Sequence, residues 1–192
     1  MNEAGDDQSA RDVFRLDNDT LAFRFTATLT NRNGSRLERL TSPQRLELWL
    51  RANDLMNTTA RATADDLRDA QDLRESIHRI GTAVCENRQA SRADVAVVNT
   101  ASELGGAHLV LHDGRALWKS TGGSPIHDAL SIVAADAIAV LGGPDRDRVK
   151  ACQGDGCTGL YVDTSRGSNR RWCSMNICGN KAKKSAMTAR AD

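Results

Sequence analysis

The chain has 192 residues, of which 40% are hydrophobic and 27% are charged, a composition typical of an ordinary globular protein. This length accommodates one medium-sized domain and one smaller domain. No run of 18 apolar residues occurs, so a membrane-spanning helix is not expected. Residues 1–12 are polar and acidic, unlike a signal peptide, and we therefore expect a cytoplasmic, bacterial-type protein.

The net charge of +1 conceals two oppositely charged parts. Residues 1–145 carry 16 Lys and Arg against 21 Asp and Glu, which gives a net charge of −5. Residues 146–192 carry ten basic residues against four acidic ones, which gives +6. A change of this size predicts a domain boundary and indicates a polyanionic partner for the C-terminal part.

The first elements of the chain are predicted to be mainly helical. Residues 1–18 are expected to form a flexible start, and residues 21–29 alternate weakly, so either a strand or a helix is compatible with them. Ser42 and Pro43 open a helix with an apolar face. The strongest helix spans about residues 64–86.

This long helix has Thr63 as its expected N-cap and carries an apolar seam with charged flanks. The seam residues recur at every third or fourth position: Ala70, Leu73, Ile77, Ile80 and Val84. They predict packing against an antiparallel helix, with a homodimer contact as the alternative. Cys85 beside the seam is interpreted as a small core residue rather than a reactive thiol.

Two further helices and a hairpin complete the predicted N-terminal domain. A helix over about 92–104 is followed by a β-hairpin with strands at 108–111 and 115–119. An apolar helix over 126–141 then ends at the Gly-Gly-Pro sequence of residues 142–144. The domain boundary is therefore expected close to residue 145.

No catalytic motif occurs in this first domain. The four histidines lie at unrelated spacings, and the sequence contains neither a glycine-rich phosphate loop nor a G-x-S-x-G nucleophile motif. We therefore expect a protein that is not an enzyme. A small-molecule pocket in the helical domain is compatible with the sequence, which names no ligand for it.

Four cysteines in the last 41 residues form two pairs of C-x4-C spacing. Fifteen residues separate Cys152 and Cys157 from Cys173 and Cys178. Two short-spaced pairs with a hairpin-sized gap are typical of four thiolates that hold one structural Zn²⁺ ion tetrahedrally. An iron–sulfur cluster and disulfides are the alternatives, and a reducing cytosol disfavours disulfides.

The order of elements around the cysteines predicts a small treble-clef-like zinc module with a knuckle, a β-hairpin and a helix. Cys152–Cys157 is the glycine-bearing knuckle, 160–163 and 170–173 are the two strands, and Ser174 caps a helix that carries Cys178. Three large side chains are expected to form its core: Leu160, Tyr161 and Trp172. So small a unit depends on a metal to fold.

The ten residues from Trp172 to Lys181, Trp-Cys-Ser-Met-Asn-Ile-Cys-Gly-Asn-Lys, resemble the signature of the CGNR zinc-finger family. The resemblance covers about residues 150–190 and includes 163–166 and Arg170-Arg171. Lys181 stands where the family has the arginine of its name. Lysine keeps the charge but lacks the planar, two-pronged guanidinium group.

The preceding region resembles the ABATE domain, a stress-induced transcription regulator that usually precedes this finger. Residues 40–50 and 109–141 carry the resemblance, whereas the family's early Leu-Asp-Phe-x-Asn-Thr pattern is degraded at 23–28. The resemblance implies a helical regulatory domain over 19–145, after the flexible start, and a CGNR-type finger over 146–192.

These features together predict a transcriptional regulator of the stress response that binds DNA through its zinc module. Six residues of the hairpin and the helix are the expected DNA contacts: Arg166, Arg170, Arg171, Asn180, Lys181 and Lys184. Asn180 has the chemistry to read adenine, with a helix-cap or zinc-shell hydrogen bond as its alternative.

Three alternatives remain open for the finger. Zinc with four thiolates carries a formal charge of −2, so part of the basic charge would serve to neutralise the site. The module would otherwise bind a protein, for example of the transcription machinery. It would also suit a thiol-based redox switch, in which oxidation of the thiolates releases zinc and a partner.

Overall fold

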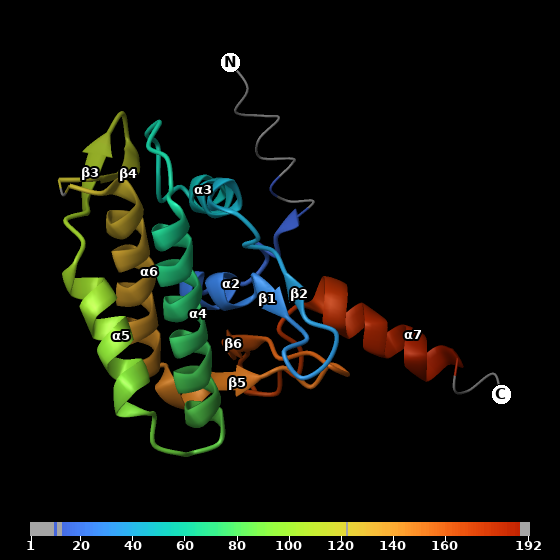
Figure 1. Ribbon diagram of the computed structural model, residues 1–192. Helices are drawn as coiled ribbons and strands as arrows, with labels where there is room; N and C mark the ends of the chain where they lie inside the picture. Colours follow the sequence, from blue (N-terminus) through green and yellow to red (C-terminus); the bar gives the residue numbers. More distant parts are fainter. Residues whose placement is uncertain (1–9, 11–12, 122, 189–192) are drawn as a thin grey trace.

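The computed structural model describes residues 10, 13–121 and 123–188, which form a helical domain and a C-terminal module packed against it (Figure 1). The helices and strands follow in the order α2 (Leu21–Thr26), β1 (Leu29–Thr30), β2 (Leu37–Glu38), α3 (Pro43–Ala52), α4 (Ala64–Cys85), α5 (Arg92–Glu103), β3 (His108–His112), β4 (Arg115–Lys119), α6 (Pro125–Gly142), β5 (Val149–Ala151), β6 (Leu160–Val162) and α7 (Asn180–Thr188). The predicted fold class, mainly helical with small antiparallel hairpins and a small cysteine module, is confirmed.

Helices α4, α5 and α6 lie side by side and form the body of the molecule (Figure 1). Helix α4 begins with a reciprocal cap, in which Asp66 N donates to Thr63 Oγ1 over 3.1 Å and Thr63 N donates to Asp66 Oδ2 over 2.7 Å. The predicted seam of α4 is buried in the protein's own core over Ala70–Ile80. It is therefore a helix-packing seam and not a dimer contact.

The ambiguous residues 21–29 form helix α2 and the start of strand β1. Phe23 and Phe25 are both fully buried, because α2 packs against α4 and α6 and also meets α3, where the Phe25 and Trp49 rings lie 4.9 Å apart. The helix is tied to α6 by Ala22 N, which donates to Asp136 Oδ2 over 2.8 Å. A short helix buried on several sides has no helical periodicity in its sequence.

Helix α6 is long and apolar enough to cross a membrane, judged by length and composition alone. It is mostly buried within the described structure, against α2, α4 and α5. Its polar side chains form contacts within the domain, since Asp128 accepts a hydrogen bond from Gly106 N over 2.6 Å. These features are typical of the central helix of a globular domain.

The β-hairpin of the cysteine module is built from different strands than the sequence predicts. Strand β6 pairs antiparallel with β5, so that Val149 lies opposite Val162, and residues 170–173 form no strand. The predicted pairing of 160–163 with 170–173 is therefore wrong. The short run Val149–Ala151 occupies the edge of β6 that the return segment would need, and that segment joins the module through Arg171 O, which accepts from Gln153 N over 2.9 Å.

Strand β6 faces two different cores with alternate side chains. Leu160 and Val162 are buried in the helical core, whereas Tyr161 is buried against the cysteines. The approach to α4 is close, because a Cβ placed on Gly81 would lie 2.5 Å from Leu160 Cδ1. Leu160 therefore belongs to the core of the helical domain and not to a separate core of the finger.

The end of the predicted flexible start also contacts both parts. Phe14 is buried in the helical core, and Asn18 Nδ2 donates to Leu160 O over 2.8 Å. Asp17 accepts a hydrogen bond from the Ser174 hydroxyl beside the cysteines. Residues 1–9 and 11–12 of that start lie outside the described residues.

Because Leu160 sits in the shared core, Leu160→Ala is expected to destabilise the helical domain by about 2–5 kcal/mol, the usual range for a buried leucine. Urea unfolding followed by helical circular dichroism measures this loss. Leu37→Ala, at an exposed leucine of β2, is the matched control and should change stability little. An unchanged helical transition in Leu160→Ala would show that the finger unfolds independently.

Candidate metal centre

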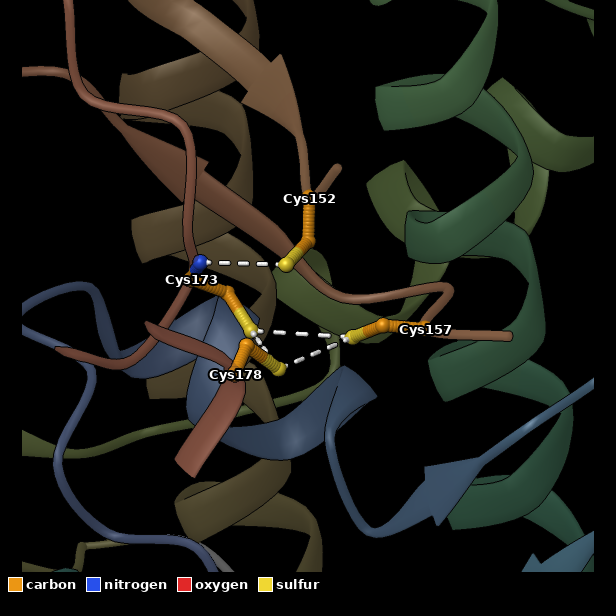
Figure 2. Close-up of side chains that lie close together, drawn as sticks. All are labelled: Cys152, Cys157, Cys173 and Cys178. Atoms are coloured by element: carbon orange, nitrogen blue, oxygen red, sulfur yellow. Dashed lines mark hydrogen bonds between the residues drawn. The ribbon is translucent and has the colours of Figure 1, made fainter. Parts of the chain in front are cut away.

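The structure brings the side chains of Cys152, Cys157, Cys173 and Cys178 together in one cluster (Figure 2). Their four sulfur atoms all lie within 4.8 Å of one another. The first two come from the loop between β5 and β6, and the other two come from the segment that leads into α7.

The geometry of the sulfur atoms fits a tetrahedral metal ion. Cys157 Sγ lies 3.7 Å from Cys173 Sγ and 3.6 Å from Cys178 Sγ, and the latter two are 3.7 Å apart. A tetrahedron with metal–sulfur bonds of about 2.3 Å has sulfur–sulfur edges of about 3.8 Å. The sulfur atoms are too far apart for disulfide bonds of about 2.05 Å, and the four-thiol donor set fits zinc.

Backbone N–H groups point at the sulfur atoms of the knuckle. Gly154 N donates to Cys152 Sγ and Gly159 N donates to Cys157 Sγ, each over 3.4 Å, and Cys173 N donates to Cys152 Sγ over 3.3 Å. Glycine is needed for this approach, because a Cβ on Gly159 would lie 2.9 Å from Cys173 Sγ. Such hydrogen bonds stabilise thiolates, the form of cysteine that binds metals.

Electrostatics within the cluster favours a cation at its centre. Hydrogen bonds from Cys152 and Cys173 lower the pKa of Cys157 to about 2, which favours the thiolate form of this residue. Burial and the negative charge of neighbouring thiolates raise the pKa of Cys178 to about 12, and hydrogen bonds to Cys152 and Cys157 raise that of Cys173. A divalent cation would offset this repulsion and displace the remaining protons.

Ser174 positions the last ligand. Its side chain caps a π-helical turn, Met175–Gly179, by accepting from Ile177 N over 3.2 Å. This turn carries Cys178 towards the other sulfur atoms and then continues as α7. The prediction that Ser174 caps a helix bearing Cys178 is confirmed, with the first turn wider than an α-helical one.

Arg170 is an internal brace of the ligand-bearing loop. Its guanidinium donates to Trp172 O over 2.9 Å and to Cys173 O over 2.8 Å, and it lies 4.7 Å above the Tyr161 ring. Tyr161 in turn donates its hydroxyl proton to Arg170 O over 2.5 Å. The donors of this guanidinium are therefore turned into the protein, which argues against the predicted DNA contact by Arg170.

Asp163 organises the turn that follows β6. Its buried carboxylate accepts from Lys150 Nζ over 2.7 Å and from the backbone N–H groups of Ser165 and Arg170, each over 3.0 Å. The hydrogen bond from Lys150 is the main reason that the pKa of Asp163 lies well below its usual range. Arg148 donates to Asp163 O over 2.7 Å. Lys150 and Arg148, two of the ten basic residues of 146–192, thus stabilise the module itself.

The other predicted DNA contacts lie on the surface. Arg166, Lys181 and Lys184 are exposed, and Arg171 is exposed while donating to Gln153 Oε1 over 2.7 Å. The alternative to adenine reading by Asn180 was a helix-cap or zinc-shell hydrogen bond. In the structure, Asn180 Nδ2 donates to Asn176 O over 3.1 Å within the same helical segment. Lys183, also exposed, was not among the predicted contacts.

His78 is a further residue of the site that its sequence context did not single out. It lies on α4, and its Nε2 donates to Thr158 O over 2.8 Å, one residue after Cys157. Burial is the main cause that lowers the pKa of His78 to about 4. His78 therefore connects the helical domain to the knuckle in its neutral form. The contact joins residues 80 positions apart, so no local pattern could reveal it.

The lowered pKa of His78 predicts a pH-dependent stabilisation. Between about pH 6.5 and pH 4 the unfolded chain binds more protons at this residue than the folded protein, so the free energy of unfolding falls as the pH falls. His78→Gln keeps an N–H donor but cannot titrate. We expect its stability deficit relative to the unmutated protein to shrink from about pH 7 to about pH 5 in urea unfolding.

The cysteines titrate in both proteins, so their contribution to the pH dependence of stability cancels in the difference between the two. A stability difference that is independent of pH would contradict the burial of a neutral His78.

The cluster predicts one zinc ion per chain, held only when all four thiolates are present. Cys173→Ser should lower zinc content and zinc affinity severely, measured by elemental analysis and by competition with a chromophoric chelator. Cys85→Ser is the matched control, because Cys85 lies outside the cluster with its Sγ 3.6 Å from Val149 O. Equal zinc binding by both variants would contradict the four-cysteine site.

Comparison with known protein families agrees with these features. Residues 19–144 match the model of the ABATE family, whose description is "Putative stress-induced transcription regulator", and residues 148–191 match the CGNR zinc-finger model. No curated protein matches the chain. Both resemblances found in the sequence are confirmed, and the finger with its four cysteines is a metal-binding module. The chain therefore belongs to the ABATE family and carries a CGNR zinc finger after its ABATE domain.

Proposed function

We propose that the protein is a cytoplasmic transcriptional regulator that binds DNA through its zinc finger. The observation that carries this proposal is helix α7, which extends away from the body of the molecule (Figure 1). It presents three exposed lysines: Lys181, Lys183 and Lys184. A projecting basic helix is a common means of entering a groove of DNA.

The charge around α7 supports the same function. The sequence contains no acidic residue between Asp163 and Asp192, and within the described residues no carboxylate pairs with the lysines of α7. Arg166 and Arg171 add two exposed cations from the loop before the finger's helix. These five basic residues are the proposed contacts to phosphates.

The role of zinc in this proposal is structural. Four thiolates complete the tetrahedron of the ion and leave no position for water or substrate, so the site supports no catalysis. The ion would hold the knuckle against the base of α7, and its binding energy would contribute to the folding of the finger.

A regulatory role of the helical domain is supported by a groove of about 390 Å³ between α4, α5 and α6. Its walls are mainly apolar and include Leu73, Val97, Leu104 and Leu130. Such a groove suits a small apolar effector.

A protein of the transcription machinery is the second candidate partner. Met175, Ile177 and Met187 are exposed large apolar residues on the same helical segment as the lysines. Phosphate contacts do not account for them, whereas protein interfaces favour methionine. DNA is the first candidate because this helical segment carries three lysines and no acidic residue.

The salt dependence of DNA binding tests the main proposal. Five phosphate contacts predict a slope of log K against log salt of about −4.5, since each contact contributes about −0.9. Replacing Lys181, Lys183 and Lys184 with Gln should reduce the slope to about −1.8 and weaken binding. Fluorescence anisotropy with duplex DNA over a salt series measures both quantities.

The matched control replaces Arg36, Arg68 and Arg92, three exposed arginines of the helical domain, with Gln. It changes the net charge equally and should leave the slope unaltered. A flat salt dependence of the unmutated protein would contradict DNA binding. Retained DNA binding by the lysine variant, with loss of a protein from a transcription complex, would favour the second candidate.

A further inference from the structure

The groove of about 390 Å³ lies between α4, α5 and α6, the three helices that form the body of the domain (Figure 1). This volume is within the range of pockets that bind small molecules. Two large apolar side chains of its walls stay accessible, since Val97 is 37% exposed and Leu104 is 63% exposed. Small side chains at Ala96 and Ala101 leave the space open. The walls therefore suit the apolar part of a ligand.

The charged residues that line this groove are acidic. Asp69 and Asp72 are both exposed and lie three residues apart on α4, so their carboxylates share one face of the helix. Among the described residues, no lysine or arginine lines the groove. Asp72 makes no hydrogen bond or ion pair within the described part of the chain. One side of an apolar groove is thus negatively charged.

The cap and the dipole of α4 account for only its first acidic residues. Asp65 and Asp66 lie in the first turn, where the helix dipole favours negative charge, and Asp66 completes the cap. Asp69 and Asp72 lie beyond that turn, and like charges at helical spacing repel one another. A cation bound in the groove would relieve this repulsion.

The arginines of α4 next to these carboxylates have other partners. Arg68 pairs with Asp65. Arg79 donates from Nε to Asp94 Oδ1 over 2.9 Å, and Asp94 is the main cause of the raised pKa of Arg79, to which the charge of Asp72 adds little. These arginines therefore do not neutralise the acidic side of the groove.

His127 is the titratable residue that α6 contributes to the groove. Its Nε2 lies 3.2 Å from Asp66 Oδ1 and 3.7 Å from Asp69 Oδ2. An imidazole carries no fixed charge, and a proton on this one would be shared between these two carboxylates. Asp72 remains without a paired cation in either state.

We infer that the groove binds an organic cation with an apolar body, that is, a hydrophobic amine. The apolar body lies against Leu104 and Leu130, and the ammonium group lies at Asp69 and Asp72. The net charge of −5 over residues 1–145 favours the approach of a cation. This inference rests on the effector groove of the proposed function and adds the charge of its ligand.

Three probes with one apolar body and different charges test the inference: naphthylethylammonium, naphthylethanol and naphthylacetate. Calorimetric titration of the full, zinc-loaded chain should give the ammonium probe a dissociation constant below about 1 mM, as expected for a ligand of this size. The alcohol should bind at least about fivefold more weakly, and naphthylacetate more weakly still. The preference for the ammonium probe should shrink as salt rises from about 0.05 to 0.5 M, because salt screens exposed charges.

A pair of double variants tests the charge. Asp69→Asn with Asp72→Asn should remove the preference for the ammonium probe over the alcohol while keeping the apolar walls. Asp54→Asn with Asp145→Asn is the matched control, because it removes two exposed aspartates outside the groove and changes the net charge equally. The control should keep the preference of the unmutated protein.

A second pair of variants tests the location. Thr100→Phe places a ring in the groove from α5 and should weaken binding of the ammonium probe at least about tenfold. Asn99→Phe places the same ring on the neighbouring exposed position of α5, outside the groove, and should leave binding unchanged. Helical circular dichroism should be the same for both variants. Equal loss of binding in both would place the ligand elsewhere.

Three results with the unmutated protein would overturn the inference. Equal binding of the ammonium and alcohol probes would make the ligand neutral. Tighter binding of naphthylacetate would make it an anion. Absence of binding of the ammonium probe up to about 1 mM would exclude the cation site.

The test is separate from the test of DNA binding. The groove lies along the first half of α4, whereas the finger meets α4 at His78 and Cys85 in its second half, so the variants should retain their zinc. The titrations contain no DNA. A flat salt series with DNA would therefore contradict the proposed function without affecting the ligand result, and failure of the probes would contradict the cation site alone.

Discussion

The structure depends on the alternation of side chains along β6. Leu160 and Val162 enter the core of the helices, while Tyr161 between them packs against the cysteines and holds the loop that carries Cys173. A strand of three residues thus joins the apolar core of the helices to the cluster of four cysteines that fits a metal ion. The finger of this protein is consequently attached to the helical domain through shared packing, with His78 and Asn18 adding hydrogen bonds across the junction.

The junction connects the four-cysteine site to the helical domain through hydrogen bonds. The knuckle is contacted from α4 through His78, and Ser174 before the π-helical turn is contacted from Asp17. An effector that moved α4 would therefore act on the residues next to Cys157. The basic residues of the finger have two different roles. Arg170 and Lys150 hold the module together, whereas the lysines of α7 face solvent.

Long elements with caps were predictable because their signals are local. The Thr63 cap and the three- and four-residue spacing of the α4 seam defined that helix, and the turn predicted at His112-Asp113-Gly114 defined the hairpin of β3 and β4, in which His112 belongs to the strand. The predicted pairing of the finger's strands was wrong because Val149–Ala151 is too short to show a strand periodicity in the sequence. The roles of Arg170 and His78 were not predictable, since their partners are carbonyl groups, which are the same in every residue.

The sequence by itself determined the four cysteines, their spacing, the basic character of the C-terminal part and the order of the main helices. These follow from residue types and from interactions between neighbours in the chain. Only the tertiary structure decided which cations remain on the surface and which face of β6 each side chain occupies. Those features depend on contacts between residues such as His78 and Thr158, whose distance along the chain leaves no trace in local patterns.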